Sequence, residues 1–416
     1  MQIGPMTTLD FSEILDASDP PLPPGLRTES GLRTRDASEL RALLEPHLAD
    51  YGITRVAHLT GFDFVGLPVH MAVKPQGRTL SSGSGKGPTT DASWVSAVME
   101  CAEQAIWESL EFEAVEASEA MMRRMGVSVV DGERLPHLKG AIWNELLPVR
   151  WVPGWDIVAG REVYIPECLV TVGGPGRDLA LKPFASGSNG LASGAHILEA
   201  ILSGLQEVIE RDGMCLRTQI DPAPRIRGDE LLQQCAPDID EKITRSGLQL
   251  EVRDSSTEVD VPTIVAYLHD VEGGRTGVFK GAGAGVSNAT ALVRAVTEAA
   301  QARCLIVAGA RDDIFETMRT SATSQPAVKL PLPEAQLEAG VDHGTGDILG
   351  DIQWMVGNLV SAGFDQVIVL RHTPPGDPVQ VARVVVPGLE GYQFAYAQTG
   401  ERAVQWAAGR ENRNSA

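Results

Sequence analysis

Residues 203–212 read S-G-L-Q-E-V-I-E-R-D, and the spacing of this stretch determines how the rest of the chain is interpreted. The same spacing occurs earlier, where residues 96–103 read S-A-V-M-E-C-A-E; both fit S-x-x-x-E-x-x-E. In a helix, positions i, i+4 and i+7 lie on one face. Each copy therefore predicts a helix with one Ser and two Glu in a stripe and apolar residues opposite. A single stripe of this kind is typical of a solvent-exposed face, but two copies with one offset favour a shared site.

A third segment has the same offsets with other residues: Arg294, Glu298 and Gln301, followed by Arg303. If the first two helices face each other, their four glutamates converge. Such a cluster repels itself unless a cation binds there, and carboxylate oxygens suit Mg²⁺ or Ca²⁺. Mg²⁺ commonly binds through a few carboxylates together with substrate phosphates. The residues alone therefore predict a Mg²⁺-nucleotide site built from helices.

The composition excludes several classes of protein. A net charge of −20 argues against binding to nucleic acid or to anionic membranes. The five cysteines are scattered without a C-x-x-C pair, which indicates reduced thiols rather than a zinc site or a disulfide framework. The sequence shows neither a signal peptide nor an 18-residue apolar stretch, so we expect a cytoplasmic protein without a membrane span.

The order of elements predicts an α/β (α+β) fold with internal pseudo-symmetry. Helices are expected over residues 36–51, 92–117, 289–308 and 352–362, with a helix over the second Ser/Glu motif. Strands are expected over 53–60, 68–73, 149–155, 161–166, 170–174, 248–252, 263–268, 277–281, 366–370 and 379–386. We expect residues 1–30 to form an extended N-terminal arm, 310–350 a polar insertion and 401–416 a frayed tail.

Glycine-rich stretches precede the first and the third of the motif helices. Residues 81–87 read S-S-G-S-G-K-G, which fails the P-loop pattern because Leu80 and Gly87 occupy two of its required positions. We interpret this stretch as a loop that can offer N–H groups to an anion. Residues 281–285 read G-A-G-A-G and predict a tight strand-to-helix turn. Three histidines (His70, His196 and His372) have no triad spacing and are interpreted as structural.

The ordered set of these motifs resembles the YcaO superfamily of ATP-dependent enzymes that modify peptide backbone amides. The matching text includes residues 52–55 with 60–63, G-K-G at 85–87 before the first Ser/Glu motif, S-N-G-L-A-S-G at 188–194 before the second, T-E-A-A-Q-A-R at 297–303, and A-R-V-V-V-P-G-L-E at 382–390. The resemblance implies a YcaO-like domain over residues 31–400, with an N-terminal part (31–75) and an ATP-binding core (76–400). It also implies a nucleotide site without a P-loop.

The resemblance assigns roles residue by residue. It implies four Mg²⁺ ligands: Glu100, Glu103, Glu207 and Glu210. It implies that Glu100, Glu207 and Arg303 carry the catalysis. It places these residues near ATP: Arg33, Ser38, Lys86, Ser96, Asn189, Ser203, Glu298 and Arg303.

The family's reaction adds a nucleophile to an amide carbonyl, after which the resulting oxyanion attacks the γ-phosphate of ATP. Two departures bear on the product. The first motif ends in Glu103-Gln104 where the family often has Glu-Arg, and the sequence ends without the Pro-rich tail of many azoline-forming members. The resemblance then implies a standalone member that makes thiazolines or macrocyclic amidines, or a thioamide-forming member beside a TfuA-like partner.

The expected partners are a ribosomally made precursor peptide, a TfuA-like or leader-binding protein, and a second copy of the chain. Two other functions stay open at this point. One is an accessory protein for methylthiolation of a ribosomal protein. The other is a non-catalytic peptide-binding scaffold with the same fold.

Overall fold

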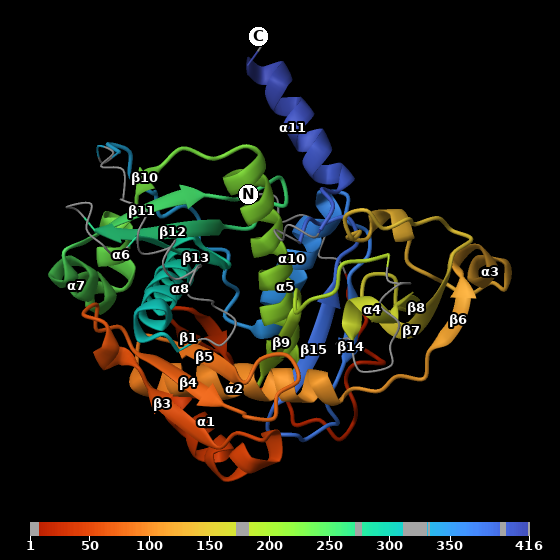
Figure 1. Cartoon of the computed structure of the whole chain (residues 1–416), viewed down its shortest axis with the longest axis horizontal. Helices are drawn as coiled ribbons and strands as arrows, with labels where there is room; N and C mark the ends of the chain where they lie inside the picture. Colours follow the sequence, from red (N-terminus) through yellow and green to blue (C-terminus); the bar gives the residue numbers. More distant parts are fainter. Residues whose placement is uncertain are drawn as a thin grey trace.

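The computed structural model describes residues 8–171, 183–270, 277–310, 331, 333–391 and 397–414. Three strand-to-helix units dominate it (Figure 1). Strand β5 (Ser82–Lys86) leads into α2 (Thr90–Ser109), β9 (Leu191–Gly194) into α5 (Ile197–Met214), and β13 (Val278–Ala284) into α8 (Asn288–Ala308). Each of these helices begins with a side-chain cap, from Thr89, His196 and Ser287 respectively. In each, the motif begins six residues after the first helical residue, so the three units are built alike.

The strands of the described residues form four sheets, and neighbouring strands in each sheet pair antiparallel. A small sheet joins β3 (Arg55–His58), β4 (Val69–Val73) and β5. A second joins β10 (Ile226–Arg227), β11 (Leu248–Asp254), β12 (Thr263–Asp270) and β13. The largest contains β6 (Val115–Ser118), β7 (Pro148–Asp156), β8 (Arg161–Pro166), β14 (Ile368–Arg371), β15 (Gln380–Val385) and β9. The fourth is the hairpin of β1 (Leu26–Thr28) and β2 (Gly31–Arg33).

The predicted α/β (α+β) class is confirmed, and α5 is the central helix of the molecule (Figure 1). Its apolar side packs with α10 (Ile348–Ser361), β15 and the N-terminal segment in one core, whose buried members include Ile201, Leu205, Ile352 and Val384. The other described α-helices are α1 (Ala37–Leu44), α3 (Glu119–Arg124), α4 (Glu167–Val170), α6 (Asp229–Cys235), α7 (Pro237–Ser246) and α11 (Glu401–Asn414). Among the helices of the described residues, none combines the length and the apolar character that a membrane span needs.

Glycines let the helices of the first and third units lie directly on their strands. A Cβ at Gly85 would sit 2.1 Å from the backbone N of Ala97, and one at Gly281 would sit 2.3 Å from the carbonyl O of Ala295. No side chain fits at either distance. These two stretches, predicted as a loop and a turn, are therefore corrected: Ser82–Lys86 is a strand, and β13 continues beyond Gly281 to Ala284.

Three other predicted boundaries were wrong. The helix expected over 92–117 ends at Ser109, because the chain turns extended at Leu110 and residues from Val115 pair with β7. A strand was expected over residues 170–174, but Val170 is the last residue of α4. Residues 172–174 lie outside the described part. The tail expected to be frayed forms α11 over Glu401–Asn414.

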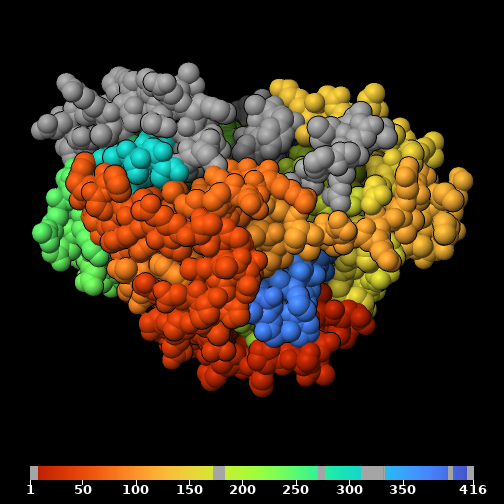
Figure 2. Space-filling view, turned by 60° about the horizontal axis from the view of Figure 1, so that its bottom comes forward, coloured from red at the N-terminus to blue at the C-terminus, as the bar shows by residue number. Residues whose placement is uncertain are grey.

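The N-terminal segment, expected as an extended arm, instead folds through turns over residues 12–19 and packs on the body. Phe11 and Ile14 are buried in the same core as α5. Figure 2 shows the N-terminal third, in red and orange, around a blue patch of the C-terminal third. A hydrogen bond of 3.0 Å from Tyr51 Oη to Asp377 joins these two parts. Segments far apart in the sequence therefore meet at this face.

Candidate active site

The three motif stripes face one cavity of about 1010 Å³. All nine stripe positions line it: Ser96, Glu100 and Glu103 from α2; Ser203, Glu207 and Glu210 from α5; and Arg294, Glu298 and Gln301 from α8. Their common position along three similar units explains the convergence, because each helix packs its apolar face away from the cavity. The three predicted stripes therefore meet at one cavity between helices.

The remaining wall of the cavity comes from several elements. Around the β1–β2 hairpin, α1 and the start of α2, the lining mixes apolar residues with charged ones: Leu26, Ala37, Leu40, Pro88, Ala92 and Val95 with Arg27, Glu29, Arg35 and Asp36. Toward the middle, Lys86 and Lys280 extend from β5 and β13, and Arg33 comes from β2. A ligand that combines a ring with anionic groups can find both apolar surface and cations in this lining.

Opposite charges meet inside the cavity. Lys86 forms an ion pair with Glu298, and Arg211 Nη2 lies 3.7 Å from Glu207 Oε1. Burial opposes ionisation of Glu298, but the adjacent Lys86 ammonium outweighs it and holds the pKa of Glu298 below its usual range. Glu298 is therefore a fixed negative charge between cations from neighbouring units.

The motif glutamates are held in an environment that disfavours their charge. Burial raises the pKa of Glu103 well above its usual range, and the negative charges of Glu207 and Glu100 add to this. Burial also raises the pKa of Glu207, and it raises that of Glu210 to about 7 with help from nearby Glu298. A cation among these oxygens would lower the pKa of all three glutamates.

Positive groups line the same space. Burial lowers the pKa of Lys280. Burial also lowers the pKa of Arg294; the positive charge of Arg33 adds to this effect, and the negative charge of Glu210 opposes it. Lys280 and Arg211 were missed as candidate site residues. The signals for them were weak: Arg211 directly follows the second motif, and Lys280 directly precedes the glycine-rich stretch 281–285.

The donor set fits Mg²⁺ in kind, since carboxylate oxygens are its usual protein ligands. The four predicted ligands come from two helices that line the same cavity, α2 and α5. Within the described ranges, no group of three His, Cys, Asp or Glu side chains is arranged to hold a metal ion. Glu103 is nevertheless within electrostatic reach of both Glu100 and Glu207.

Arg303 does not line the cavity. It is buried on another side of α8, where its Nε donates to Asp63 Oδ1 at 3.1 Å and its guanidinium lies 4.4 Å from the Phe64 ring centroid. Arg303 follows Glu298 by five residues, a rotation of about 140° around a helix, so the two side chains point in different directions. The geometry places Arg294, not Arg303, beside the glutamates.

Two other predicted nucleotide contacts also lie outside the lining. Ser38 donates from its N–H and its Oγ to Asp36, which lines the cavity itself. Asn189 packs against Gly391, and its carbonyl oxygen accepts from Arg383 at 2.7 Å. The other predicted residues near ATP (Arg33, Lys86, Ser96, Ser203 and Glu298) all line the cavity.

The fold is shared with solved structures. A heterocyclase in complex with substrate and cofactor superposes with a TM-score of 0.71 at 19% identity, covering 89% of this chain. This chain spans only 55% of that heterocyclase. YcaO from Methanopyrus kandleri, bound with AMPPCP and Mg²⁺, superposes with a TM-score of 0.68 at 24% identity, over 88% of this chain and 93% of that one.

Sequence comparison places the chain more closely. A protein from Rhizobium leguminosarum bv. trifolii, described as lying in the tfuA 3′ region, is 33% identical over 393 residues, which cover 89% of this chain and 92% of the relative. The sequence pattern of the YcaO cyclodehydratases, described as ATP- and Mg²⁺-binding, matches residues 84–390, a range that contains all three motif helices. This chain belongs to the YcaO cyclodehydratase family, whose cofactors are ATP and Mg²⁺.

Proposed function

We propose that the protein activates a backbone amide of a ribosomally made precursor peptide by transferring the γ-phosphoryl group of ATP to the amide oxygen. The observation that carries this proposal is the cavity itself, in which two Ser/Glu stripes and an Arg/Glu/Gln stripe face one another. Phosphoryl transfer needs little covalent chemistry from a protein. It needs positioning and compensation of negative charge, and this cavity supplies both.

The side chains divide the work. Glu100, Glu103, Glu207 and Glu210 would hold Mg²⁺, which neutralises charge on the phosphates when bound. Phosphate oxygens would be bound by the cations of the cavity: Lys86, Lys280, Arg211 and Arg294. Arg33, which comes from β2, would assist them. The adenine ring would lie against the apolar residues Leu26, Leu40 and Val95, which line the cavity away from the motif glutamates. Arg303 is left out of this set, since it binds Asp63.

The reaction balances without an oxidant. A nucleophile adds to the amide carbonyl carbon, and the oxyanion that forms attacks the γ-phosphorus and displaces ADP. The carbon–oxygen bond then breaks, and the amide oxygen leaves in inorganic phosphate. With sulfide as the nucleophile, loss of a proton leaves a thioamide; with a substrate thiol, hydroxyl or amine, it leaves a ring.

Among these products, we favour the thioamide, formed in the cytoplasm beside a TfuA-like partner that delivers sulfide. The 33% identity to a protein of a tfuA 3′ region, over most of both chains, supports this choice. Formation of an azoline or a macrocyclic amidine is the second candidate, supported by the shared fold of a heterocyclase.

The test is mass spectrometry of candidate precursor peptides incubated with the protein, a TfuA-like partner, ATP, Mg²⁺ and sulfide. Exchange of oxygen for sulfur supports thioamide formation, and loss of water supports ring formation. Peptide labelled with ¹⁸O at the amide carbonyl should pass the label to phosphate in either case. Modified peptide with unlabelled phosphate would contradict the O-phosphorylation step.

A further inference from the structure

The β1–β2 hairpin, which forms part of the cavity wall, is joined to α5 by a residue outside the motifs. Glu199, in the first turn of α5, is 5% exposed and lines the cavity. Its Oε2 accepts from the Thr34 Oγ at 2.5 Å and from the Thr34 N–H at 3.3 Å. Its Oε1 lies 3.7 Å from Arg33 Nε. One carboxylate therefore contacts two successive residues at the end of the β1–β2 hairpin.

These contacts fix the direction of the Arg33 guanidinium. Its Nε faces Glu199, and its Nη1 donates to the Leu32 carbonyl at 2.9 Å. The side chain is one-third exposed, and it lines the cavity together with Arg294. A guanidinium is planar, so two fixed nitrogens also fix the edge that the third presents.

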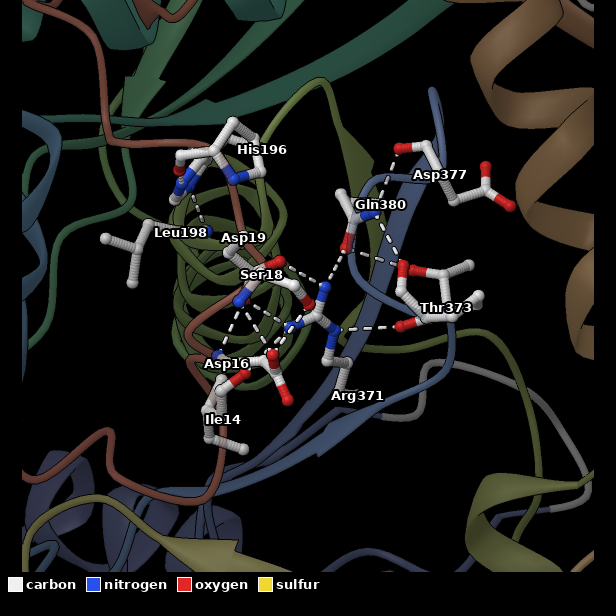
Figure 3. A network of polar contacts seen from close by, with 12 residues as sticks. Ile14, Asp16, Ser18, Asp19, His196, Leu198, Arg371, Thr373, Asp377 and Gln380 are labelled. Carbon is white, nitrogen blue, oxygen red and sulfur yellow. Dashed lines mark hydrogen bonds and ion pairs between the residues drawn. The ribbon is translucent and has the colours of Figure 1, made fainter.

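The start of α5 also anchors the N-terminal segment at a second place, shown in Figure 3. His196 caps α5 by accepting from the Leu198 N–H at 3.1 Å, so its other ring nitrogen donates to the Pro20 carbonyl at 3.1 Å. Beside it, Arg371 binds both carboxylate oxygens of Asp19, at 2.6 and 2.7 Å. The stretch between Pro20 and Thr34, which includes the hairpin, is thus held at both ends.

We propose that Glu199 is a positioning residue: it orients Arg33 so that Arg33 and Arg294 together bind phosphate groups of the nucleotide. This inference rests on the proposed function. It predicts weaker nucleotide binding when Glu199 loses its charge. A purely electrostatic role predicts the opposite, because removal of a carboxylate beside an anion site should tighten binding. A purely structural role, such as a favourable contact with the N-terminus of α5, predicts lower stability with unchanged affinity.

The variant Glu199→Gln separates these roles. Its amide oxygen can still accept from Thr34, but its NH₂ group would face the Arg33 Nε–H, and two donors do not pair. We expect calorimetry with AMPPCP and Mg²⁺ to show roughly fivefold weaker binding than in the wild type, as for the loss of one ion pair.

The matched control is Glu119→Gln. Glu119 is likewise a buried glutamate in the first turn of a helix, where it accepts from the Gly132 N–H at 3.0 Å and pairs with Arg123 at 2.6 Å. It does not line the cavity. We expect it to lower the melting temperature without changing the affinity for AMPPCP.

A double-mutant cycle completes the test. If Glu199 acts through Arg33, then Glu199→Gln added to Arg33→Met should weaken AMPPCP binding no further than Arg33→Met alone. Unchanged or tighter binding by Glu199→Gln, or additive losses in the double variant, would overturn the inference and leave the proposed function standing. A wild-type protein that fails to bind AMPPCP with Mg²⁺ would instead refute the proposed function itself.

Discussion

The first two strand-to-helix units and the third share one frame but carry different charges. Units β5–α2 and β9–α5 each present a Ser and two Glu to the cavity, whereas β13–α8 presents Arg294, Glu298 and Gln301 at the corresponding positions. The three units share the same backbone arrangement, a strand followed by a helix, and differ in the side chains that line the cavity. The difference gives the cavity two carboxylate walls and one wall that mixes a cation, an anion and an amide.

The units also differ in how they are anchored. Helix α5 is buried and tied at its end by Asp212, which is fully buried and binds the Arg402 guanidinium with both oxygens at 2.8 Å. Helix α2 is also tied near its end by a buried ion pair, between Glu108 Oε2 and Lys74 Nζ at 2.7 Å, and His70 Nδ1 of β4 lies 2.7 Å from Ser93 Oγ near its start. The two helices are thus anchored by similar contacts to different parts of the chain, α5 to α11 and α2 to β4 and the residue after it.

The largest effect on the strand-to-helix units is expected at Gly281, where β13 lies directly against α8. Gly281→Val would place a side chain against the backbone of Ala295 and Ala299, which cannot move without α8. We expect a loss of more than about 3 kcal/mol in the free energy of unfolding, measured by urea titration. As a control, Gly357→Ala in α10 meets nothing within 4 Å and should be neutral or stabilising. A tolerated Gly281→Val would contradict the close packing of β13 and α8.

The anchoring of α5 is tested by Asp212→Asn. This change removes the charge of the buried Asp212 from its pair with Arg402, which keeps only the more exposed Glu258 as a charged partner. We expect a loss of about 3 kcal/mol in the free energy of unfolding. Glu241→Gln breaks an exposed pair with Arg245 and should cost less than about 0.5 kcal/mol. Equal effects of the two changes would show that the Asp212 contact is not a structural anchor.

The charge difference between the units is tested by Arg294→Met. Loss of the cation that α8 contributes should weaken binding of AMPPCP with Mg²⁺ by roughly 10- to 100-fold, as for a charged hydrogen-bond partner of phosphate. Arg245→Met, on the exposed face of α7, should leave the affinity unchanged. Calorimetry decides between them, and equal affinities would exclude Arg294 from phosphate binding.

The support of α2 predicts a dependence on pH. Burial, with the neighbouring His58, lowers the pKa of His70 to about 4, from 6.5 as a free side chain. At pH 5 the unfolded chain binds this proton and the folded protein does not. Stability from this group is therefore fully present above pH 6.5 and falls as the pH drops toward 4.

Relative to pH 7, the expected loss at pH 5 is about 2 kcal/mol. His70→Asn keeps a donor for Ser93 without titrating in this range. Urea titrations at both pH values should therefore show a smaller difference between pH 7 and pH 5 for His70→Asn than for the wild type. The same difference in both proteins would exclude His70 as the source.

The sequence predicts features that depend on local periodicity, and it fails where distant residues decide. The motif helices and the cavity-facing stripes follow from helical spacing, and the predicted helix over 289–308 is confirmed as α8. Strand β5 reads as a loop because its Ser and Gly residues are poor strand formers, and only the helix packed on it makes them suitable.

The direction of Arg303 could not be predicted for a similar reason. Its partner Asp63 lies 240 residues away in the sequence, and no local pattern links the two. The ordered helix α11 depends in the same way on Asp212, which binds Arg402 in its first turn. Glu199 carries no motif signal at all, and its contacts with Thr34 appear only once α5 and the β1–β2 hairpin are packed together.

The central claim is that three helices, without a P-loop, form a Mg²⁺-dependent nucleotide site. Its most direct test is calorimetry of AMPPCP binding to the wild type and to Glu207→Gln, each with and without Mg²⁺. Glu207 lines the cavity on α5, beside Arg211. The account predicts binding by the wild type that requires Mg²⁺ and is lost in Glu207→Gln. Binding that is independent of Mg²⁺, or equal in both proteins, would contradict it.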